Sequence, residues 1–352
     1  MSFRKLWKAA ELKDYQRVER PSALLNQAEE ISAPPFPPPL STKVMNKEGT
    51  ITFKNLTKEA KMVERKELTR VIYEKDGSIA TITLNYPEKL NAMDFPGDGG
   101  IADGFYRDAL DLAEQDDEIK VVKITGTGRA FCAGHDLSRV GFVYGMTPGK
   151  RAGQQPRLKV DNAWMEKTFR RLFLFPKITI AVVNGLAFGE GIMITECCDL
   201  AVASEDAVFS HREQRLAFGG QVSPLAVVTY GLKRALDIWL TGRNVTASEA
   251  LEIGLVNRVV PKDRLDEEAD TLAQDIATLG RDVIAIGKAS RQQTYSQMGI
   301  LAGWDIAGMT HTLGTNVHWY PGEYNFFKER KDKGEKAGFH GLHDQFSSKD
   351  EK

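Results

Sequence analysis

The chain has 352 residues, of which 42% are hydrophobic and 27% are charged, and its formal net charge is −1. This composition is typical of a globular protein that buries a core in one large domain with an appendage, or in two domains. The near-zero charge gives no overall basic field, so neither nucleic acid nor an anionic membrane is expected as a partner.

The first residues of the chain carry no targeting pattern. Residues 1–20 mix basic residues with acids and have no apolar run, which counts against a signal peptide and a mitochondrial presequence. No later apolar stretch reaches the length of about 18 residues that a membrane-spanning helix needs. The three cysteines suit a reducing compartment, and none has the spacing of zinc ligands. We therefore expect a cytoplasmic protein without a metal site.

Residues 1–67 form a predicted extension. A charged segment is followed by the proline-rich run APPFPPP at residues 33–39 and by a polar stretch. Such a run favours an extended polyproline-type spacer or a strap on another surface. A docking peptide for a proline-binding domain is the alternative.

The compact core is expected to begin at Leu68. Residues 71–74 and 79–84 predict two strands joined by a turn, and residues 101–118 carry apolar side chains at helical spacing. Short β-rich runs at 121–126 and 178–183 predict buried strands. This alternation of strands and helices indicates an α/β architecture with crossover connections.

The second half of the chain is expected to be mostly helical. Residues 200–203 and 207–209 still predict strands, whereas 223–280 favour helices, one of them closed by Gly254 as a C-cap. The predicted divisions are an extension at 1–67, a core at 68–265, and a C-terminal helical region with a charged tail at 266–352.

Two glycine-bearing turns each follow a β-rich run and each lead into a helix-like stretch. The first is RAFCAGHDL at residues 129–137, and the second is NGLAFGEG at 184–191. Glycine lets a ligand approach the backbone, and a helix that begins there points free N–H groups at it. Two such turns together could hold one developing oxyanion between two backbone amides.

The segments around these turns resemble the crotonase superfamily, the enoyl-CoA hydratase/isomerase group. The similarity runs from about Leu68 to Gly334 and includes LNYPEKLNAM at 84–93, both turns, and residues 241–260. Several ordered matches are more specific than a lone glycine motif. The resemblance implies repeated ββα units wound into a superhelix, trailing helices used for trimer assembly, and acyl-CoA thioester substrates.

The resemblance assigns the two oxyanion donors to the backbone N–H groups of His135 and Glu190. It also implies that Ala133, Gly134 and Gly189 border the substrate. Glu190 stands where glycine is common in the family, so its side chain points somewhere new, and its direction is left open. The side chain of His135 is expected to line or flank the pocket.

Proton transfer needs a side chain, and the family's hydratases usually place two glutamates across the substrate. The first of these positions is Met193 here, which cannot transfer a proton, whereas the second matches Glu213. A surface or salt-bridged carboxylate is the alternative for Glu213. His211 shares a strand face with it and could bind it or the substrate, and Gln221 could orient a water molecule.

Three further features of the sequence bear on the site. Glu196 is expected to be structural. The basic stretch with Lys150, Arg151, Arg157 and Lys159 is expected to be a solvated loop, with closure over the coenzyme A phosphates as the alternative. Helix breakers at 95–100 interrupt a segment that shapes the acyl pocket in the family, which suggests an unusual acyl group.

The sequence thus predicts an enzyme that stabilises a thioester enolate, most simply an enoyl-CoA hydratase with Glu213 as acid and base. A double-bond isomerase is the close alternative, and a thioester hydrolase or C–C lyase follows. A CoA-binding assembly subunit with reduced catalysis is the non-enzymatic alternative. Coenzyme A is part of the substrate, so no separate cofactor is expected, and the resemblance implies a homotrimer or a dimer of trimers.

Overall fold

The computed structural model describes residues 43–45, 51–53, 63–137, 152–216, 223–314, 317–334, 337–338 and 340–341. The chain divides into two compact units, Met1–Glu59 and Ala60–Lys352. In the first unit, strands β1 (Lys43–Met45) and β2 (Ile51–Phe53) pair antiparallel. Every other described element belongs to the second unit.

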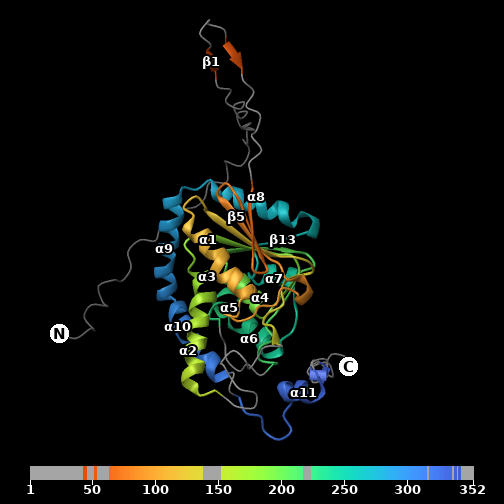
Figure 1. The fold of residues 1–352 in the computed structure, drawn as a ribbon. Helices are drawn as coiled ribbons and strands as arrows, with labels where there is room; N and C mark the ends of the chain where they lie inside the picture. The colour runs from red at the N-terminus through yellow and green to blue at the C-terminus, as the bar shows by residue number, and fades with distance from the viewer. Residues whose placement is uncertain are drawn as a thin grey trace, which may run out of the picture. The chain divides into compact units, whose positions relative to one another are not determined.

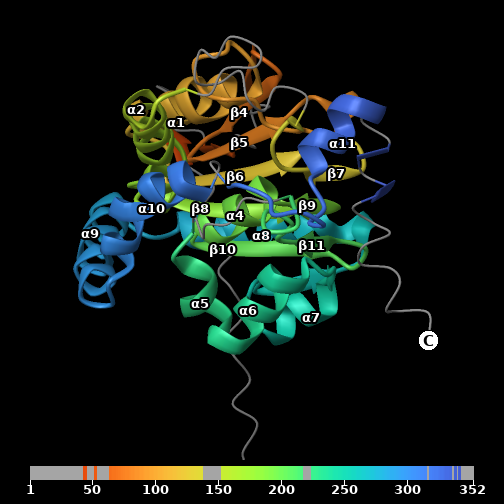
Figure 2. The same ribbon diagram turned by 90° about the horizontal axis from the view of Figure 1, so that it is seen from below.

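A seven-stranded sheet runs through the second unit in the order β13-β10-β8-β6-β5-β4-β3 (Figures 1 and 2). Strands β3, β4 and β5 are antiparallel neighbours, and the remaining pairs are parallel. The strand bounds are β3 (Glu64–Leu68), β4 (Val71–Asp76), β5 (Ile79–Leu84), β6 (Val121–Gly126), β8 (Ile178–Val183), β10 (Leu200–Ser204) and β13 (Arg258–Val260). The strand pair, both buried strands and the α/β architecture predicted from the sequence are confirmed.

A second, four-stranded sheet has the order β12-β11-β9-β7. Its strands are β7 (Ala130–Cys132), β9 (Leu186–Phe188), β11 (Val208–Ser210) and β12 (Val245–Thr246). Strands β7 and β9 are parallel, with Ala130 opposite Leu186 and Cys132 opposite Ala187. Because each strand lies within one of the glycine-bearing turns, this pairing brings the two turns side by side.

The short helix α4 (Glu190–Cys197) follows the second turn and is buried at all eight positions. It packs against β7 so closely that a Cβ on Gly191 would lie 2.2 Å from the carbonyl oxygen of Cys132. Only glycine permits this approach, and it fixes the N-terminus of α4 beside the first turn.

Helices cover the remaining faces of the sheets (Figures 1 and 2). Helix α8 packs on β6, β8 and β10 through a separate apolar cluster that includes Val121, Val182 and Leu272. Helix α10 lies along α2, with α9 beside it. The helix bounds here are α2 (Gln154–Met165), α8 (Leu265–Ala277), α9 (Arg281–Gln297) and α10 (Ile300–Gly314).

The remaining helical elements are shorter than the sequence suggested. The helix expected over 101–118 is present over residues 101–115, with a π-helical segment η4 (Asp103–Ala109) followed by α1 (Leu110–Gln115). Within 223–280, β12 and β13 interrupt the helices because each pairs with a strand distant in sequence. The other elements are η3 (Pro87–Lys89), η6 (Glu166–Arg170), α3 (Arg171–Phe173), α5 (Leu225–Tyr230), α6 (Leu232–Thr241), α7 (Ala247–Glu252), η7 (Lys262–Arg264) and α11 (Phe326–Lys333).

In the part of the chain that the structure describes, no helix combines the length and the apolar character needed to cross a bilayer. The same residues contain no group of three or more histidine, cysteine or acidic side chains arranged to hold a metal ion.

Candidate active site

The two turns touch each other at their glycines. Gly134 has φ +90° and Gly189 has φ +52°, a backbone region that side-chain-bearing residues rarely adopt. A Cβ on Gly134 would lie 3.0 Å from the Phe188 carbonyl oxygen and 3.5 Å from the Glu190 backbone nitrogen. The two backbones therefore approach to van der Waals distance at this point.

Backbone hydrogen bonds fix the two turns that carry the expected oxyanion donors. Met93 donates to the Gly134 carbonyl at 2.8 Å, and Asp136 donates to the Met93 carbonyl at 2.8 Å. These bonds hold the first turn from either side of the His135 amide. Glu190 is the first residue of α4, so its N–H is one of the four that have no acceptor within the helix.

A cavity of about 370 Å³ opens against both turns. Its walls include Ala133, Gly134, Gly189 and Met193, which the family resemblance implies to be near the substrate, together with His135, Glu190 and Glu213. Apolar side chains from other elements complete it, among them Trp164, Phe169 and Leu216. The arrangement is a mostly apolar chamber with residues of both turns and a few ionisable side chains at its wall.

The Glu213 carboxyl lies next to the second turn, close to Gly189. Its Oε1 is 3.5 Å from the position that a Cβ on Gly189 would occupy. The carboxyl is a quarter exposed, whereas His211 and Glu196 behind it are almost fully buried. His211 Nδ1 lies 3.4 Å from Glu213 Oε1, and His211 Nε2 lies 3.0 Å from Glu196 Oε1.

Glu196 is held in turn by two hydroxyl groups. Tyr230 donates to Oε1 at 2.5 Å, and Ser223 donates to Oε2 at 3.0 Å. The result is a buried chain from Glu196 through His211 to the cavity-lining Glu213. Glu196, which the sequence suggested to be structural, contacts His211 rather than the cavity.

The two acids set the charge of the histidine between them. Burial lowers the pKa of His211. The negative charges of Glu196 and Glu213 and their hydrogen bonds outweigh burial and raise this pKa to about 10. Burial likewise raises the pKa of Glu213, but the cationic His211 outweighs it, so that this pKa lies below its usual range. Glu213 is therefore an ionised carboxylate at neutral pH.

The Glu190 side chain points inward, toward η4. Its Oε1 accepts a hydrogen bond from the Tyr106 hydroxyl at 3.0 Å, and its Oε2 lies 3.2 Å from His135 Nδ1. Burial raises the pKa of Glu190 to about 8 and lowers that of His135 to about 4. At pH 7 the carboxyl of Glu190 is therefore protonated and the imidazole of His135 is neutral. The two side chains form a contact between neutral groups and not an ion pair.

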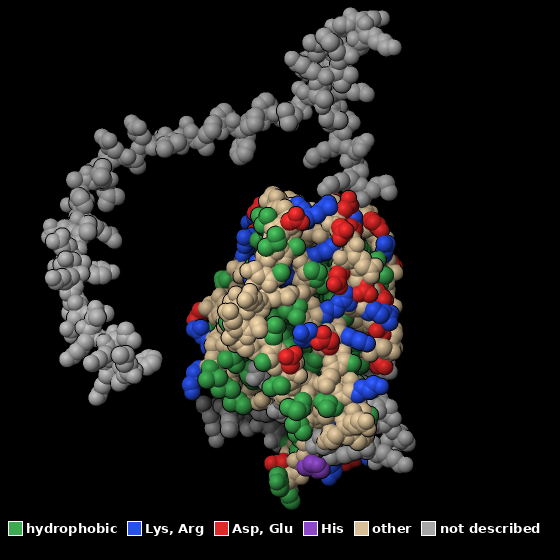
Figure 3. Space-filling model, turned by 90° about the vertical axis from the view of Figure 1, so that its left-hand side faces the viewer, with side chains coloured by type: hydrophobic (Ala, Val, Ile, Leu, Met, Phe, Trp, Pro, Cys, Tyr) green, Lys and Arg blue, Asp and Glu red, His purple; other side chains and the backbone are tan. Residues whose placement is uncertain are grey.

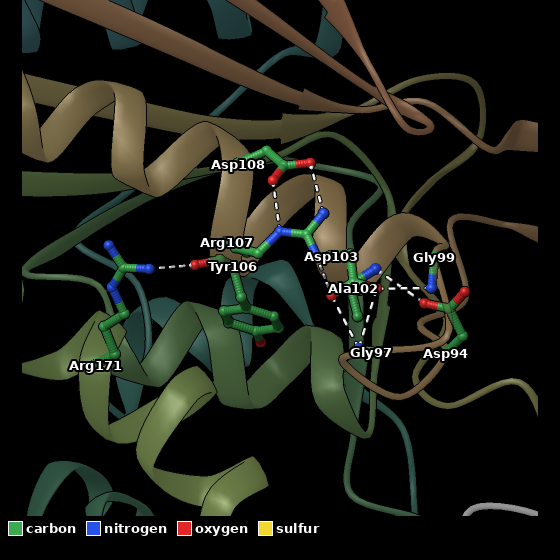
Figure 4. Close-up of polar contacts among 9 residues, drawn as sticks. All are labelled: Asp94, Gly97, Gly99, Ala102, Asp103, Tyr106, Arg107, Asp108 and Arg171. Atoms are coloured by element: carbon green, nitrogen blue, oxygen red, sulfur yellow. Dashed lines mark hydrogen bonds and ion pairs between the residues drawn. The ribbon is translucent and has the colours of Figure 1, made fainter.

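The helix breakers after residue 94 fold into the loop that supports this region (Figure 4). Asp103 accepts hydrogen bonds from the backbone of Gly97 and Gly99, and Asp94 accepts one from Ala102. Phe95, from the same loop, stacks on the His135 ring with centroids 4.8 Å apart and planes within 3°. The interrupted segment thus contributes an aromatic wall beside the cavity.

Several residues of this site carried no signal in the sequence. Tyr106 reaches Glu190 from η4, and Trp164 and His311 line the cavity from α2 and α10. His311 Nδ1 lies 3.1 Å from Asp161 Oδ1. Each lies far along the chain from the turns, so only tertiary packing identifies them.

Two further predictions concern Gln221 and the basic stretch that includes Lys150, Arg151 and Arg157. Gln221, Lys150 and Arg151 lie outside the described residues. Arg157 contradicts the expected solvated loop, because it is buried on α2 and donates a hydrogen bond to the Thr312 carbonyl. Helix α2 begins at Gln154, which places Arg157 within a helix that packs on α10.

Comparison with known proteins decides the family. The sequence model described as enoyl-CoA hydratase/isomerase matches residues 74–333. The chain belongs to the enoyl-CoA hydratase/isomerase family. The resemblance drawn from the sequence is confirmed, and membership makes the chain an acyl-CoA-processing enzyme.

Relatives of this family agree in sequence and in fold. A putative enoyl-CoA hydratase of Thermus thermophilus is 37% identical over 202 residues, covering 57% of this chain and 75% of the relative. A short-chain-enoyl-CoA hydratase of Clostridium acetobutylicum is 34% identical, covering 63% and 80%. The crystal structure of an enoyl-CoA hydratase/isomerase from Xanthobacter autotrophicus Py2 superposes with TM-score 0.68 at 31% identity, over 80% of this chain and 99% of that one.

Proposed function

We propose that the protein is an enoyl-CoA hydratase that adds water across the double bond of an α,β-unsaturated thioester. The observation that carries this proposal is the contact of the two turns, with the Glu213 carboxylate facing the cavity beside them. Hydratases predominate among the named relatives, which supports hydration over other reactions of the family.

The backbone amides of His135 and Glu190 form the oxyanion hole in this proposal. Attack at the β-carbon puts negative charge on the thioester oxygen as an enolate. Two preorganised N–H donors stabilise that charge where it develops, and losing one such donor typically costs about 3 kcal/mol of transition-state stabilisation. Ala133 has only a methyl side chain and Gly134 and Gly189 have none, which lets the thioester approach the backbone.

Glu213 is the acid and base. Its ionised carboxylate takes a proton from the attacking water, whose oxygen bonds to the β-carbon, and returns a proton to the α-carbon as the enolate collapses. His211 acts through Glu213: its positive charge keeps the carboxylate ionised, and Glu196 holds the imidazolium in place. Met193 takes no part in proton transfer.

Double-bond isomerisation is the second candidate, and one observation favours it. Glu213 is an ionised carboxylate at the cavity wall, and a single proton carrier suffices to move a proton between two carbons. No cofactor is required for either reaction. A cytoplasmic location stays a prediction that rests on the composition of residues 1–20.

Assembly as a homotrimer or a dimer of trimers is also proposed. The face formed by α9 and α10 exposes large apolar side chains, visible as green patches in Figure 3. These are Val283, Ile286, Met298, Ile306, Met309 and Leu313. Patches of this kind mark protein–protein contacts, and sedimentation velocity measures the assembly directly.

The test is a panel of enoyl-CoAs incubated with the purified protein and analysed by mass spectrometry. Hydration adds the mass of one water molecule, whereas isomerisation leaves the mass unchanged and shifts retention. Glu213→Gln should abolish turnover while acyl-CoA binding persists, and Glu252→Gln on the surface is the matched control. Full activity of the Glu213 variant would refute the mechanism, and CoA binding without turnover by the wild type would support the assembly-subunit alternative.

A further inference from the structure

The cavity at the two turns has an exposed end and a buried end. Lys89 and Arg212 line it and are exposed to solvent, whereas Trp164, Phe169 and His311 line it and are buried. In the proposed function, on which this inference rests, the thioester oxygen lies at the turns. The large and charged coenzyme A then occupies the exposed end, and the acyl group enters the buried end. The residues of the buried end therefore select the acyl group.

His311 brings ring nitrogens to this buried end, where its neighbours offer mainly aromatic carbon. The centroid of the Trp164 ring lies 4.9 Å from that of His135 and 4.7 Å from that of His311. The three rings thus form a row that leads from the first turn to α10. His311 is at the α10 end of this row, so an acyl group meets it at a distance from the thioester.

Asp161 on α2 holds the His311 ring in place. The side chain of Asp161 has no exposed surface, and its Oδ1 lies 3.1 Å from His311 Nδ1. Its Oδ2 accepts a hydrogen bond from the Thr312 hydroxyl at 2.5 Å. The two helices are in close contact here, because a Cβ on Gly308 would lie 2.1 Å from Asn162 Oδ1. The backbone and the carboxylate together fix where the imidazole lies.

Helix pairing alone does not account for a histidine at this position. The Thr312 hydroxyl bonds Asp161, and Arg157 bonds the Thr312 carbonyl, so polar contacts between α2 and α10 exist without the cavity-facing part of His311. An apolar side chain would complete the wall at lower cost, because a buried polar group is unfavourable unless it is bonded. A polar side chain at the buried end of an acyl pocket points to a polar group on the ligand.

We propose that His311 binds an oxygen atom near the far end of the acyl group, so that the enzyme prefers acyl-CoA substrates that carry an uncharged oxygen there. Asp161 faces Nδ1, and Nε2 is the nitrogen on the other side of the ring. An imidazole nitrogen bonds a hydroxyl group as donor or as acceptor, and it bonds a keto oxygen as donor. A carboxylate would bring a charge into the buried end, which is costly.

The expected preference is that of one hydrogen bond between a side chain and an uncharged group. We expect about a 10-fold higher kcat/KM for the oxygenated substrate than for a methyl-ended one of the same length. The methyl-ended substrate loses because it leaves the imidazole nitrogen without a partner in an enclosure that water barely enters.

The test compares enoyl-CoAs of matched length that end in a hydroxyl, a keto, a methyl or a carboxylate group, from hexenoyl to decenoyl. Wild type should prefer the hydroxyl or keto substrate at the length that reaches His311. His311→Phe keeps a ring against Trp164 and should bring the ratio to the methyl-ended substrate close to one. His311→Gln restores a donor and an acceptor and should keep part of the ratio. Asp305→Asn, an exposed acid on the same helix, is the matched control and should leave it intact.

Asp161 is a positioning residue in this proposal, because it acts through His311. Asp161→Asn should lower the ratio of the two kcat/KM values, whereas a purely structural role would lower both values equally. Calorimetric binding of saturated acyl-CoAs with the same end groups measures the preference without turnover. It decides the question if His311→Phe fails to fold by circular dichroism, and it separates this proposal from the proposed hydration.

Three results would overturn the proposal. They are equal kcat/KM values for oxygenated and methyl-ended substrates at every length in wild type, an unchanged ratio in His311→Phe, and a preference for the carboxylate. A calorimetric preference for the oxygenated ligand that persists without any hydration would support the site at His311 and refute the proposed reaction.

Discussion

Replacing Glu190 with glutamine should change how the stability of the fold depends on pH. The pKa of this carboxyl is about 8 in the folded protein and 4.5 in its ordinary setting. Between these values the folded state holds a proton that the unfolded state has released. Stability contributed by protonated Glu190 is therefore complete below pH 4.5 and is lost as pH rises toward 8.

The magnitude follows from linkage. One proton difference changes the free energy of unfolding by about 1.4 kcal/mol per pH unit, which over this window amounts to about 5 kcal/mol. Glutamine does not titrate, so Glu190→Gln removes this slope. All other groups titrate in both proteins, so the difference between the two isolates residue 190.

The assay is urea unfolding of both proteins at pH 5.5, 6.5 and 7.5, at one fixed protomer concentration, since assembly would shift apparent stability. The free energy of unfolding of the wild type should fall by about 1.4 kcal/mol per pH unit relative to that of the variant. Glu252→Gln, an exposed acid on α7, should run parallel to wild type. Parallel curves for wild type and Glu190→Gln would show that the buried carboxyl is ionised in the folded state, which would refute its neutral assignment.

Two other substitutions test the frame around the site. His211→Asn removes the positive charge that keeps the pKa of Glu213 low, so the acidic limb of the kcat/KM profile should move to higher pH. An acidic limb at the same pH as in the wild type would exclude this coupling. Gly191→Ala puts a methyl group 2.2 Å from a carbonyl oxygen of β7. It should destabilise the protein by at least about 2 kcal/mol, measured by thermal unfolding, and wild-type stability would show that α4 can move.

Local pattern predicted the framework of this fold well. The β-branched runs of β5, β6 and β8 are long enough and apolar enough to identify buried strands, and the glycines of both turns identify close backbone contacts. Strand β12, with two residues, carries no such pattern and exists only because it pairs with β11. The π-helical turn in η4 likewise has no local signature.

The same distinction, between local pattern and tertiary packing, applies to the residues of the candidate site. Glu213 and the two amides follow from motif position, because the residues that define them are contiguous. The direction of the Glu190 side chain does not, because it depends on a hydroxyl group 84 residues away at Tyr106. His211 could be placed on the same strand face as Glu213, but its charge depends on Glu196, whose carboxyl meets it only through the packing of α4.

The carboxyl at residue 190 lies on the N-terminal residue of α4, and two effects compete there. The helix dipole favours an ionised carboxylate at this end by about 0.3–1 kcal/mol, and by up to about 2 kcal/mol in partly buried cases. Burial favours the neutral acid by about 5 kcal/mol, from the shift of its pKa to about 8. Burial wins, so the acid is neutral at pH 7.

That outcome matters to the chemistry, because the amide of the same residue is a proposed oxyanion donor. A carboxylate beside a developing enolate would repel it, whereas a neutral carboxyl would not. Turnover by wild type should therefore fall as pH rises through about 8, and Glu190→Gln should remain level between pH 7 and 9. Initial rates corrected for uncatalysed thioester hydrolysis measure this. A wild-type profile that stays level over the same range would show that ionisation of Glu190 does not affect the charge that develops on the reacting oxygen.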